Sequence, residues 1–419
     1  MEPQLHSWTP NVSTEAIWES LSQQSFCAIL DVKDWRIGAL SSTARWWYQG
    51  SEWQHLSPFE ASKTAFHFQE HEHTPPFLEG LLAIISFDGR LHGWIADHSI
   101  AHHKPTNRWY CWGTNAQFHK LLSTFTYSHA SSSTNKSKDS IANPIANPIE
   151  HSMTQAQYEQ TVKTVQEEIR NGNVYQINLA HQIGPYTIDT PLETWLELTD
   201  DNPARHAFFW KTPSEILLCN SPELFLQFDA SRSVTSLPIK GTHTDVGNPE
   251  AHVELWESPK ERAELTMIVD MMRNDISSIS EYGSVFTEDR KIRRCGDLLH
   301  AEQRVMGQRR ADTSILEAVH ACFPPASVTG APKKSALSYI RTLESVNRGW
   351  YTGSFGFLDI RGHSTWNVII RTLQGKQNEN GSMTAHLNIG AGIVYDSEPE
   401  SEWFETMAKG RAIERVLGQ

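Results

Sequence analysis

The sequence has few cysteines, and they are widely separated. Five of its 419 residues are Cys, at positions 27, 111, 219, 295 and 322, and no two of them form a CxxC pair. An odd and dispersed set of this kind is typical of reduced thiols, and it offers no thiolate zinc site. The first residues, MEPQLHSWTP, also lack the basic and apolar regions of a secretory signal. We therefore expect a cytoplasmic protein.

Basic residues are fewer than acidic residues. The chain has 36 Lys and Arg against 49 Asp and Glu, so its formal net charge is −13. A nucleic-acid-binding protein needs a basic face, so we expect no nucleic-acid partner. No stretch approaches the roughly 18 apolar residues that span a bilayer, so we expect no membrane association. The Walker GK[ST] and dinucleotide GxGxxG motifs are absent as well.

Tryptophan, by contrast, is abundant. There are 15 Trp residues, and nine of them fall within the first 112 residues. Such side chains can form a core or a ligand site, and packing is the preferred interpretation because large aromatics mostly serve packing.

The chain divides by composition into three parts. Residues 1–127 contain short strand-like runs, residues 128–152 are rich in Ser, Asn and Pro, and residues 153–419 show regular periodicity. The middle part predicts a linker or long loop, because it has too few apolar residues to offset the conformational entropy that ordering would cost. A length of 419 residues is compatible with two subdomains or with one large layered domain.

The third part predicts mixed helices and strands. Thr154 caps a helix that runs to Ile169, and Ser258-Pro259 opens another that runs to about Asp275. Between them, VYQINLAHQI alternates as a strand, with Ile177 on one face and Gln176 on the other. A further helix is expected near residues 331–343. The pattern favours a large α+β domain.

Two pairs of Glu residues suggest a metal site. Glu261 and Glu264, and likewise Glu402 and Glu405, are three residues apart within expected helices, which places each pair on one helix face. Two such faces would supply oxygen ligands for a hard cation such as Mg²⁺, and Lys409 lies on the same face as Glu405. The alternative is an ordinary solvated surface, which spacing alone does not exclude.

Lys240 ends a strand in the segment PIKGT. A Lys in low-dielectric surroundings can lose its proton and act as a nucleophile. From an ordinary pKa near 10.4, holding it neutral at pH 7 costs roughly 4.6 kcal/mol. The structural alternative for a strand-end Lys stays open on this evidence.

Three further features are less specific. The turn at 325–333 could bind a carboxylate through its backbone N–H groups, and Gly390-Ala391-Gly392 could let the backbone approach a ligand. Either is equally compatible with a plain loop, and His300 alone with a structural histidine.

Together these segments resemble a known family. VYQINLAHQ, SPELFL, PIKGT, SPKERAELTMIVDMMRND, FPPASVTGAPK, RGWYTGSFGFLD and GAGIVYDSEPESEWFET occur in the order found in chorismate-utilising enzymes, over about residues 154–415. The resemblance implies an α+β fold in which two large antiparallel β-sheets pack face to face with helices on the outside. It also implies that residues 1–127 belong to the same body, and that Mg²⁺ and chorismate occupy a cleft.

The resemblance also implies roles for individual residues. Glu264 and Glu405 match direct ligands of Mg²⁺, and Glu261 and Glu402 match partners that act through water or in support. The remaining matches are substrate or acid–base positions. Tyr351 and Arg371 match residues that hold the enolpyruvyl carboxylate. The rest of the substrate cradle is matched by Gly390, Ala391 and Gly392, through their backbone, and by Lys409, Thr242 and Gln176. Glu223 matches the acid that protonates the departing C4 hydroxyl, and His300 matches an active-site histidine.

Two positions discriminate among family members. Enzymes that add water at C2 carry Lys where this chain has Gln176, and an amide cannot serve as that base. Anthranilate synthases read PIAGT, whereas PIKGT with Lys240 is the mark of aminodeoxychorismate synthases. The implied reaction replaces the C4 hydroxyl of chorismate by an amino group through a covalent Lys240 intermediate, for 4-aminobenzoate and folate synthesis. The chain shows no glutaminase domain, so ammonia is expected from a glutamine amidotransferase subunit.

Two alternatives remain beside this interpretation: anthranilate synthase component I, which releases pyruvate, and a non-catalytic chorismate-binding scaffold. The chain also departs from the usual motifs at three places. His243 follows PIKGT where Arg is usual. Residues 263–265 read AEL where AEN is common, and residues 301–303 read AEQ instead of LVS. None of these removes a proposed catalytic group.

Overall fold

The computed structural model describes most of the chain. The described residues are 4–8, 10, 13–24, 27–32, 34–40, 46–50, 74–114, 116–117, 149–244, 250–295 and 298–418. Residues 128–148 of the predicted linker lie outside these ranges. The last four residues of that segment are described, and they include the short strand β9 (Glu150–His151), which pairs with the edge of a sheet.

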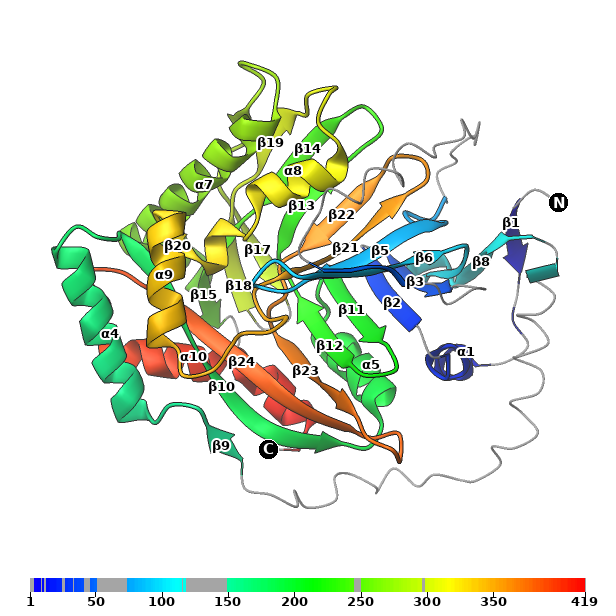
Figure 1. Cartoon of the computed structure of the whole chain (residues 1–419), viewed down its shortest axis with the longest axis horizontal. Helices are drawn as coiled ribbons and strands as arrows, with labels where there is room; N and C mark the ends of the chain where they lie inside the picture. The colour runs from blue at the N-terminus through cyan, green and yellow to red at the C-terminus, as the bar shows by residue number, and fades with distance from the viewer. Residues whose placement is uncertain are drawn as a thin grey trace.

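Within the described residues, two large antiparallel sheets form the centre of the molecule, and a small third sheet lies beside them (Figure 1). The larger sheet, in spatial order, contains β1 (Gln4–Trp8), β8 (Arg108–Gly113), β7 (His98–His103), β3 (Trp35–Leu40), β2 (Cys27–Val32), β11 (His206–Lys211), β12 (Ile216–Ser221), β23 (Thr372–Gln377), β24 (Met383–Ile393), β10 (Gln176–Ile188) and β20 (Gly330–Ala331), with β9 beside β10.

The second sheet is ordered β16 (Phe286–Thr287), β19 (Val305–Gln308), β14 (Ser233–Leu237), β13 (Leu224–Phe228), β22 (Ser364–Asn367), β21 (Ser354–Asp359), β5 (Gly80–Ile85), β6 (Leu91–Ala96) and β4 (Trp46–Gly50). The small sheet is ordered β15 (Ile239–Thr244), β18 (Leu298–Glu302) and β17 (Lys291–Cys295).

Strands from the two ends of the chain share both large sheets. Leu30 of β2 is paired with Phe208 of β11, and Leu82 of β5 is paired with Phe357 of β21. The segments on either side of residues 118–148 are therefore joined by continuous hydrogen-bonded sheets.

The core between the sheets is rich in aromatic side chains. Phe208 stacks on Phe355 of the opposite sheet with ring centroids 4.0 Å apart, and Trp94 lies 6.1 Å from Trp210. In the N-terminal part, five tryptophans are buried: Trp18, Trp35, Trp94, Trp109 and Trp112. The packing interpretation of these residues is confirmed. The side chains of Trp46 and Trp47, and all of Trp53, lie outside the described part of the chain.

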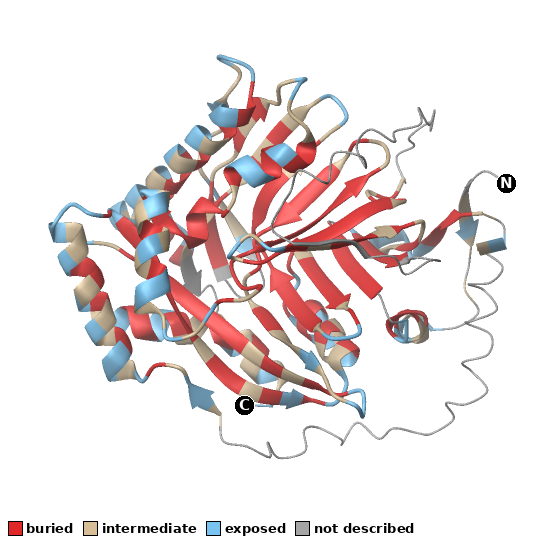
Figure 2. Ribbon diagram, viewed as in Figure 1, coloured by how far each residue is buried: buried red, intermediate tan, exposed pale blue. Residues whose placement is uncertain are grey.

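Helices cover the outer faces of the sheets, and their solvent-facing sides are exposed (Figure 2). The larger sheet packs against α1 (Thr14–Ser22), α5 (Pro191–Asp201) and α10 (Pro399–Val416), and the second sheet against α7 (Pro259–Ile279) and α8 (Ile315–Cys322). The small sheet packs against α6 (Ala251–Glu257). The helices α4 (Gln155–Arg170) and α9 (Lys333–Leu343) pack against one end of β10 and β24. The predicted α+β fold with two face-to-face sheets is confirmed.

Local sequence signals explain where these helices begin. The Thr154 side chain and Gln157 form a reciprocal capping box at the start of α4. Ser258 caps α7, and Pro259 occupies its first turn, where a missing N–H costs nothing. Across the described residues, no helix combines the length and the apolar character that a membrane crossing requires.

Candidate active site

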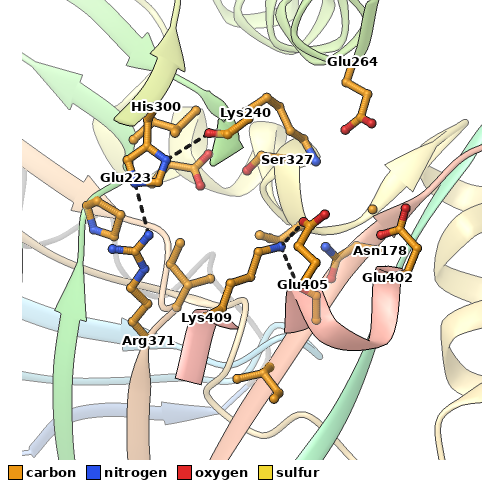
Figure 3. Close-up of a pocket in the computed structure, with 18 of the residues that line it drawn as sticks. Asn178, Glu223, Lys240, Glu264, His300, Ser327, Arg371, Glu402, Glu405 and Lys409 are labelled. Atoms are coloured by element: carbon orange, nitrogen blue, oxygen red, sulfur yellow. Dashed lines mark hydrogen bonds and ion pairs between the residues drawn. The ribbon is translucent and has the colours of Figure 1, made fainter. Parts of the chain in front are cut away.

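A pocket lies over the β10–β24 pair, between α7, α10 and the small sheet (Figure 3). Twelve of the fifteen predicted site residues line it: Glu223, Lys240, Glu261, Glu264, His300, Tyr351, Arg371, Gly390, Gly392, Glu402, Glu405 and Lys409. These residues are up to 186 positions apart in the sequence, from Glu223 to Lys409, so the fold itself assembles the site.

The other three predicted residues are placed differently. Ala391 is fully buried in the apolar cluster beneath β24, because strand alternation turns its side chain away from its glycine neighbours. Its predicted place in the cradle concerns the backbone and stays a prediction. Gln176 is 1% exposed and does not line the pocket, although its amide and the Lys240 Nζ both lie close to the position that a Cβ on Gly392 would take. The side chain of Thr242 lies outside the described residues.

The four glutamates come from two facing helices. Glu402 is 2% exposed, Glu261 and Glu264 are half-buried, and the Glu405 side chain is 45% exposed. Burial raises the pKa of Glu261, Glu264 and Glu402, and the charge of Glu405 raises the pKa of Glu261 and Glu402 further. The cluster is thus a set of carboxylates that oppose one another's ionisation.

Lysines offset part of this repulsion. Lys409 lies 2.8 Å from Glu405 and lowers the pKa of that carboxyl. Lys260, one residue before Glu261, lies 3.5 Å from Glu402, and all four carboxylates raise its pKa against the effect of burial. Lys260 was not predicted as a site residue. The signal was available, because Lys260 stands four residues before Glu264 on the same helix face.

The donor chemistry of this cluster suits Mg²⁺. All four side chains are hard oxygen ligands, and a divalent cation would relieve the repulsion that raises three of their pKa values. In the described residues, however, no three acidic, His or Cys groups stand close enough together to enclose a metal ion. The magnesium site remains a prediction.

Glu223 faces the opposite part of the pocket, and Lys240 reaches between it and the carboxylates. Glu223 lies in the short turn between β12 and β13 and is 5% exposed. Burial raises the pKa of Glu223 to about 7, although a hydrogen bond from Ser327 and the charge of Lys240 oppose the shift. A carboxyl with this pKa is about half protonated at neutral pH, which suits a general acid.

His300 links Arg371 to the strand that carries Lys240. Its Nδ1 is 3.1 Å from the Gly241 carbonyl, and its Nε2 is 3.2 Å from Arg371 Nη2. A carbonyl only accepts and a guanidinium only donates, so the proton resides on Nδ1 and Nε2 accepts. Burial, then the charge of Arg371, lowers the pKa of His300 to about 3. The ring is neutral and orients Arg371, whose own backbone has φ 51°.

The floor of the pocket is open because it is built from glycine. A Cβ at Gly390 would lie 3.1 Å from the Tyr351 hydroxyl oxygen, and a Cβ at Gly392 would lie 3.1 Å from the Lys240 Nζ. Lys409 Nζ donates to the Gly390 carbonyl oxygen at 2.9 Å. These glycines therefore make room for side chains that reach in from other elements.

Besides Lys260, three polar side chains in the lining were not predicted individually: Asn178, Ser327 and Asn388. Asn178 lies two residues after Gln176 on the same strand face, so strand alternation could have identified it. Ser327 belongs to the turn that was expected to bind through its backbone. No signal in the sequence points to Asn388.

Comparison with known proteins gives a consistent result. The family model described as chorismate binding enzyme matches residues 25–415. An anthranilate synthase component 1 of Haloarcula marismortui is 36% identical over 275 residues, which cover 64% of this chain and 55% of that protein. The aminodeoxychorismate synthase component 1 of Bacillus subtilis is 32% identical over 269 residues, which cover 63% of this chain and 58% of that protein. The chain thus matches little more than half the length of these relatives.

Solved structures share the fold over the whole chain. The anthranilate synthase component I of Streptococcus pneumoniae superposes with a TM-score of 0.72 and 21% identity, over 99% of this chain and 92% of that one. The menaquinone-specific isochorismate synthase MenF of Escherichia coli superposes with a TM-score of 0.75 and 16% identity, over 100% and 94%. The family match spans both large sheets except β1, and it includes every lining residue of the pocket, so the chain belongs to the chorismate binding enzyme family.

Proposed function

We propose that the protein is an aminodeoxychorismate synthase component I, which converts chorismate and ammonia to 4-amino-4-deoxychorismate. The observation that carries the proposal is the position of Lys240. Its side chain points into the pocket, where its charge interacts with that of Glu223, and the Lys240 Nζ lies above the glycine floor (Figure 3). An amine and a partly protonated carboxyl in one pocket are the two groups that the substitution at C4 requires.

The reaction proceeds in two displacements. The neutral Lys240 amine forms a bond to C2 of chorismate, the two conjugated double bonds of the ring both shift by one position toward C4, and the C4 hydroxyl leaves as water with the proton of Glu223. Ammonia then bonds to C4, both double bonds shift back, and the C2–N bond to Lys240 breaks. Glu223 takes up the proton that the incoming amine loses. The enolpyruvyl group stays on the ring throughout.

The remaining side chains bind and orient. Arg371 holds a substrate carboxylate by a bidentate pair, and His300 fixes the direction of its guanidinium. Glu264 and Glu405 would bind Mg²⁺ directly, with Glu261 and Glu402 in support. When bound, the ion would offset the charge of these carboxylates against the dianionic substrate.

Ammonia would come from a glutamine amidotransferase subunit. The two relatives described above are named component 1, which supports a second component. Free ammonium should replace that subunit in a test with the purified chain.

A covalent adduct on Lys240 tests the proposal. Chorismate and Mg²⁺ without ammonia should leave a substrate-derived mass on the peptide that contains Lys240, and added ammonium should discharge it as product. If Lys240 stays unmodified with chorismate and Mg²⁺ in the absence of ammonia, while the same preparation forms product once ammonium is added, the covalent route is contradicted.

Anthranilate synthase component I is the second candidate. It is favoured by the higher identity to the Haloarcula relative, 36% against 32% for the Bacillus aminodeoxychorismate synthase. That reaction eliminates pyruvate and yields a fluorescent aromatic amine. Release of pyruvate in step with ammonia consumption would establish it in place of our proposal.

A further inference from the structure

Arg348 lies directly beneath the pocket and does not line it. Its side chain is 2% exposed, and it follows α9 in the segment RGWYTG. Its guanidinium pairs with Glu344 through Nε at 2.9 Å and through Nη2 at 2.6 Å, and Glu344 is 5% exposed. A buried cation therefore has a fully buried counter-charge.

The same guanidinium joins two segments that are far apart in the sequence. Nη1 donates to the Val328 carbonyl at 2.9 Å, and Nη2 donates to the Asn178 carbonyl at 2.6 Å. Val328 belongs to the turn η3 (Ala326–Val328), and Asn178 to β10. Both residues line the pocket. Only a planar fork with several N–H groups makes these bonds at once, and lysine has no such fork.

The Glu344 carboxylate extends the network along β10. Its Oε1 accepts from the Ala180 N–H at 2.9 Å while it accepts from Arg348. The Arg348 carbonyl, in turn, accepts from the Asn388 amide at 3.1 Å. Asn388 is another residue that lines the pocket. The Arg348 and Glu344 side chains thus hold β10, and the Arg348 backbone carbonyl holds β24.

Arg348 also supports a strained residue next to Tyr351. Thr352 has φ 62°, a conformation that β-branched residues rarely adopt. Arg348 Nη1 donates to the Thr352 hydroxyl at 3.1 Å, and that hydroxyl donates to the Tyr351 carbonyl at 2.6 Å. Strain of this kind persists only where surrounding contacts hold it.

We propose that Arg348, with Glu344, is the positioning residue of the substrate cradle: it holds β10, the 326–328 turn and the Tyr351 turn in the arrangement that binds substrate. It touches no substrate and acts through Asn178, Val328 and Tyr351. The inference is about pocket geometry, and its kinetic readout rests on the proposed use of chorismate.

The test compares Arg348→Lys with Arg36→Lys. Arg36 is a matched control because it also forms a buried bidentate pair, with Asp31 at 2.8 and 2.9 Å, and its side chain is 7% exposed. It does not line the pocket. Both variants should lose thermal stability. Only Arg348→Lys should lower kcat/KM for chorismate, by about 100-fold and mainly through KM, because misplacing a cradle by about 1 Å has an effect of this size.

Two readouts separate positioning from general destabilisation. Hydrogen exchange in Arg348→Lys should accelerate in peptides covering 176–182 and 325–331, and this result does not depend on which product is made. Millimolar guanidinium should restore part of the activity of Arg348→Ala and none in a Lys240→Ala chain. Equal kinetic losses in Arg348→Lys and Arg36→Lys, or exchange that rises evenly across the chain, would overturn the proposal. A product other than 4-amino-4-deoxychorismate would affect only the proposed function.

Discussion

The two ends of the pocket handle charge in opposite ways (Figure 3). At the carboxylate end, formed by Glu261, Glu264, Glu402 and Glu405, like charges raise one another's pKa and lysines only partly offset them. At the acid–base end, formed by Glu223, His300 and Arg371, each group has a defined partner, and the pKa of Glu223 lies at about 7.

The difference indicates that the two ends of the pocket have different functions. A cluster of unrelieved carboxylates is suited to take up a cation, and its function should depend on metal concentration. A carboxyl with a pKa of about 7 is suited to transfer a proton, and the function of the acid–base end should depend on pH. Lys240 and Lys409 point into the space between the two ends. The activity of variants at the carboxylate end should therefore respond to added Mg²⁺, and the activity of variants at the acid–base end should not.

The largest effect is expected for Lys240→Ala. Without the amine no covalent intermediate forms, and product formation from chorismate, ammonium and Mg²⁺ should fall to the level of the uncatalysed mixture. Neither added Mg²⁺ nor a change of pH should restore it. Lys334→Ala, which removes an exposed lysine from α9, serves as the control and should keep full activity. Full retention of activity by Lys240→Ala would exclude the covalent role.

Glu223→Gln should lower kcat by about 10²- to 10⁴-fold, the usual contribution of a general acid or base. In the unchanged protein, kcat/KM should fall above pH 7 with a pKa of about 7, because Glu223 must be protonated to act. Folding raises this pKa from 4.5, so stability declines as pH rises from 4.5 to 7.

The same substitution should therefore change stability in the opposite sense to activity. Above pH 7 the native protein contains a buried ionised carboxylate, which glutamine replaces with a neutral group of the same shape. Thermal unfolding at pH 8 should show that Glu223→Gln is more stable than the unchanged chain. A less stable variant at pH 8, or a pH profile that does not change between pH 6 and 8, would contradict the assignment.

Glu264→Gln should act through metal affinity. Removing one carboxylate lowers the charge of the cation site, so the Mg²⁺ concentration for half-maximal activity should rise by at least about tenfold. Saturating Mg²⁺ should recover most of the activity, in contrast to Lys240→Ala. Glu257→Gln on α6 removes an exposed acid outside the cluster and should leave the Mg²⁺ requirement unchanged. Failure of high Mg²⁺ to rescue Glu264→Gln would argue against a ligand role.

The smallest effect, with the opposite sign, is expected for Lys260→Gln. The positive charge of this lysine interacts with all four carboxylates. Without it the carboxylates repel one another more strongly, and a bound metal ion then gains more by neutralising them. Mg²⁺ affinity measured by calorimetry should rise by about tenfold, a modest change because the Lys260 side chain is 46% exposed. Weaker Mg²⁺ binding by this variant would mean that Lys260 supports the metal site.

Local signals in the sequence predicted much of the fold. The Thr154 cap and the Ser258-Pro259 pair correctly marked the starts of α4 and α7, because caps depend on neighbouring residues alone. The pairing of β2 with β11 was not predictable from pattern, since it joins segments about 180 residues apart. The end of the predicted linker forms β9 because β10 offers it an edge to pair with.

For the site, spacing alone left the two glutamate pairs undecided between a metal cluster and a solvated surface. Resemblance to a family supplied the expectation that they face each other. Arg348 was not singled out at all, because its role rests on contacts to residues 20 and 170 positions away. The tautomer of His300 likewise follows from its two partners in space, and no sequence pattern encodes it.

The identity of the product tests the central claim most directly. Purified chain should be incubated with chorismate, ammonium and Mg²⁺, and the products analysed by mass, by fluorescence and for released pyruvate. We predict a non-aromatic amine that retains the enolpyruvyl group, with no pyruvate and no anthranilate fluorescence. Stoichiometric pyruvate together with anthranilate would contradict the account.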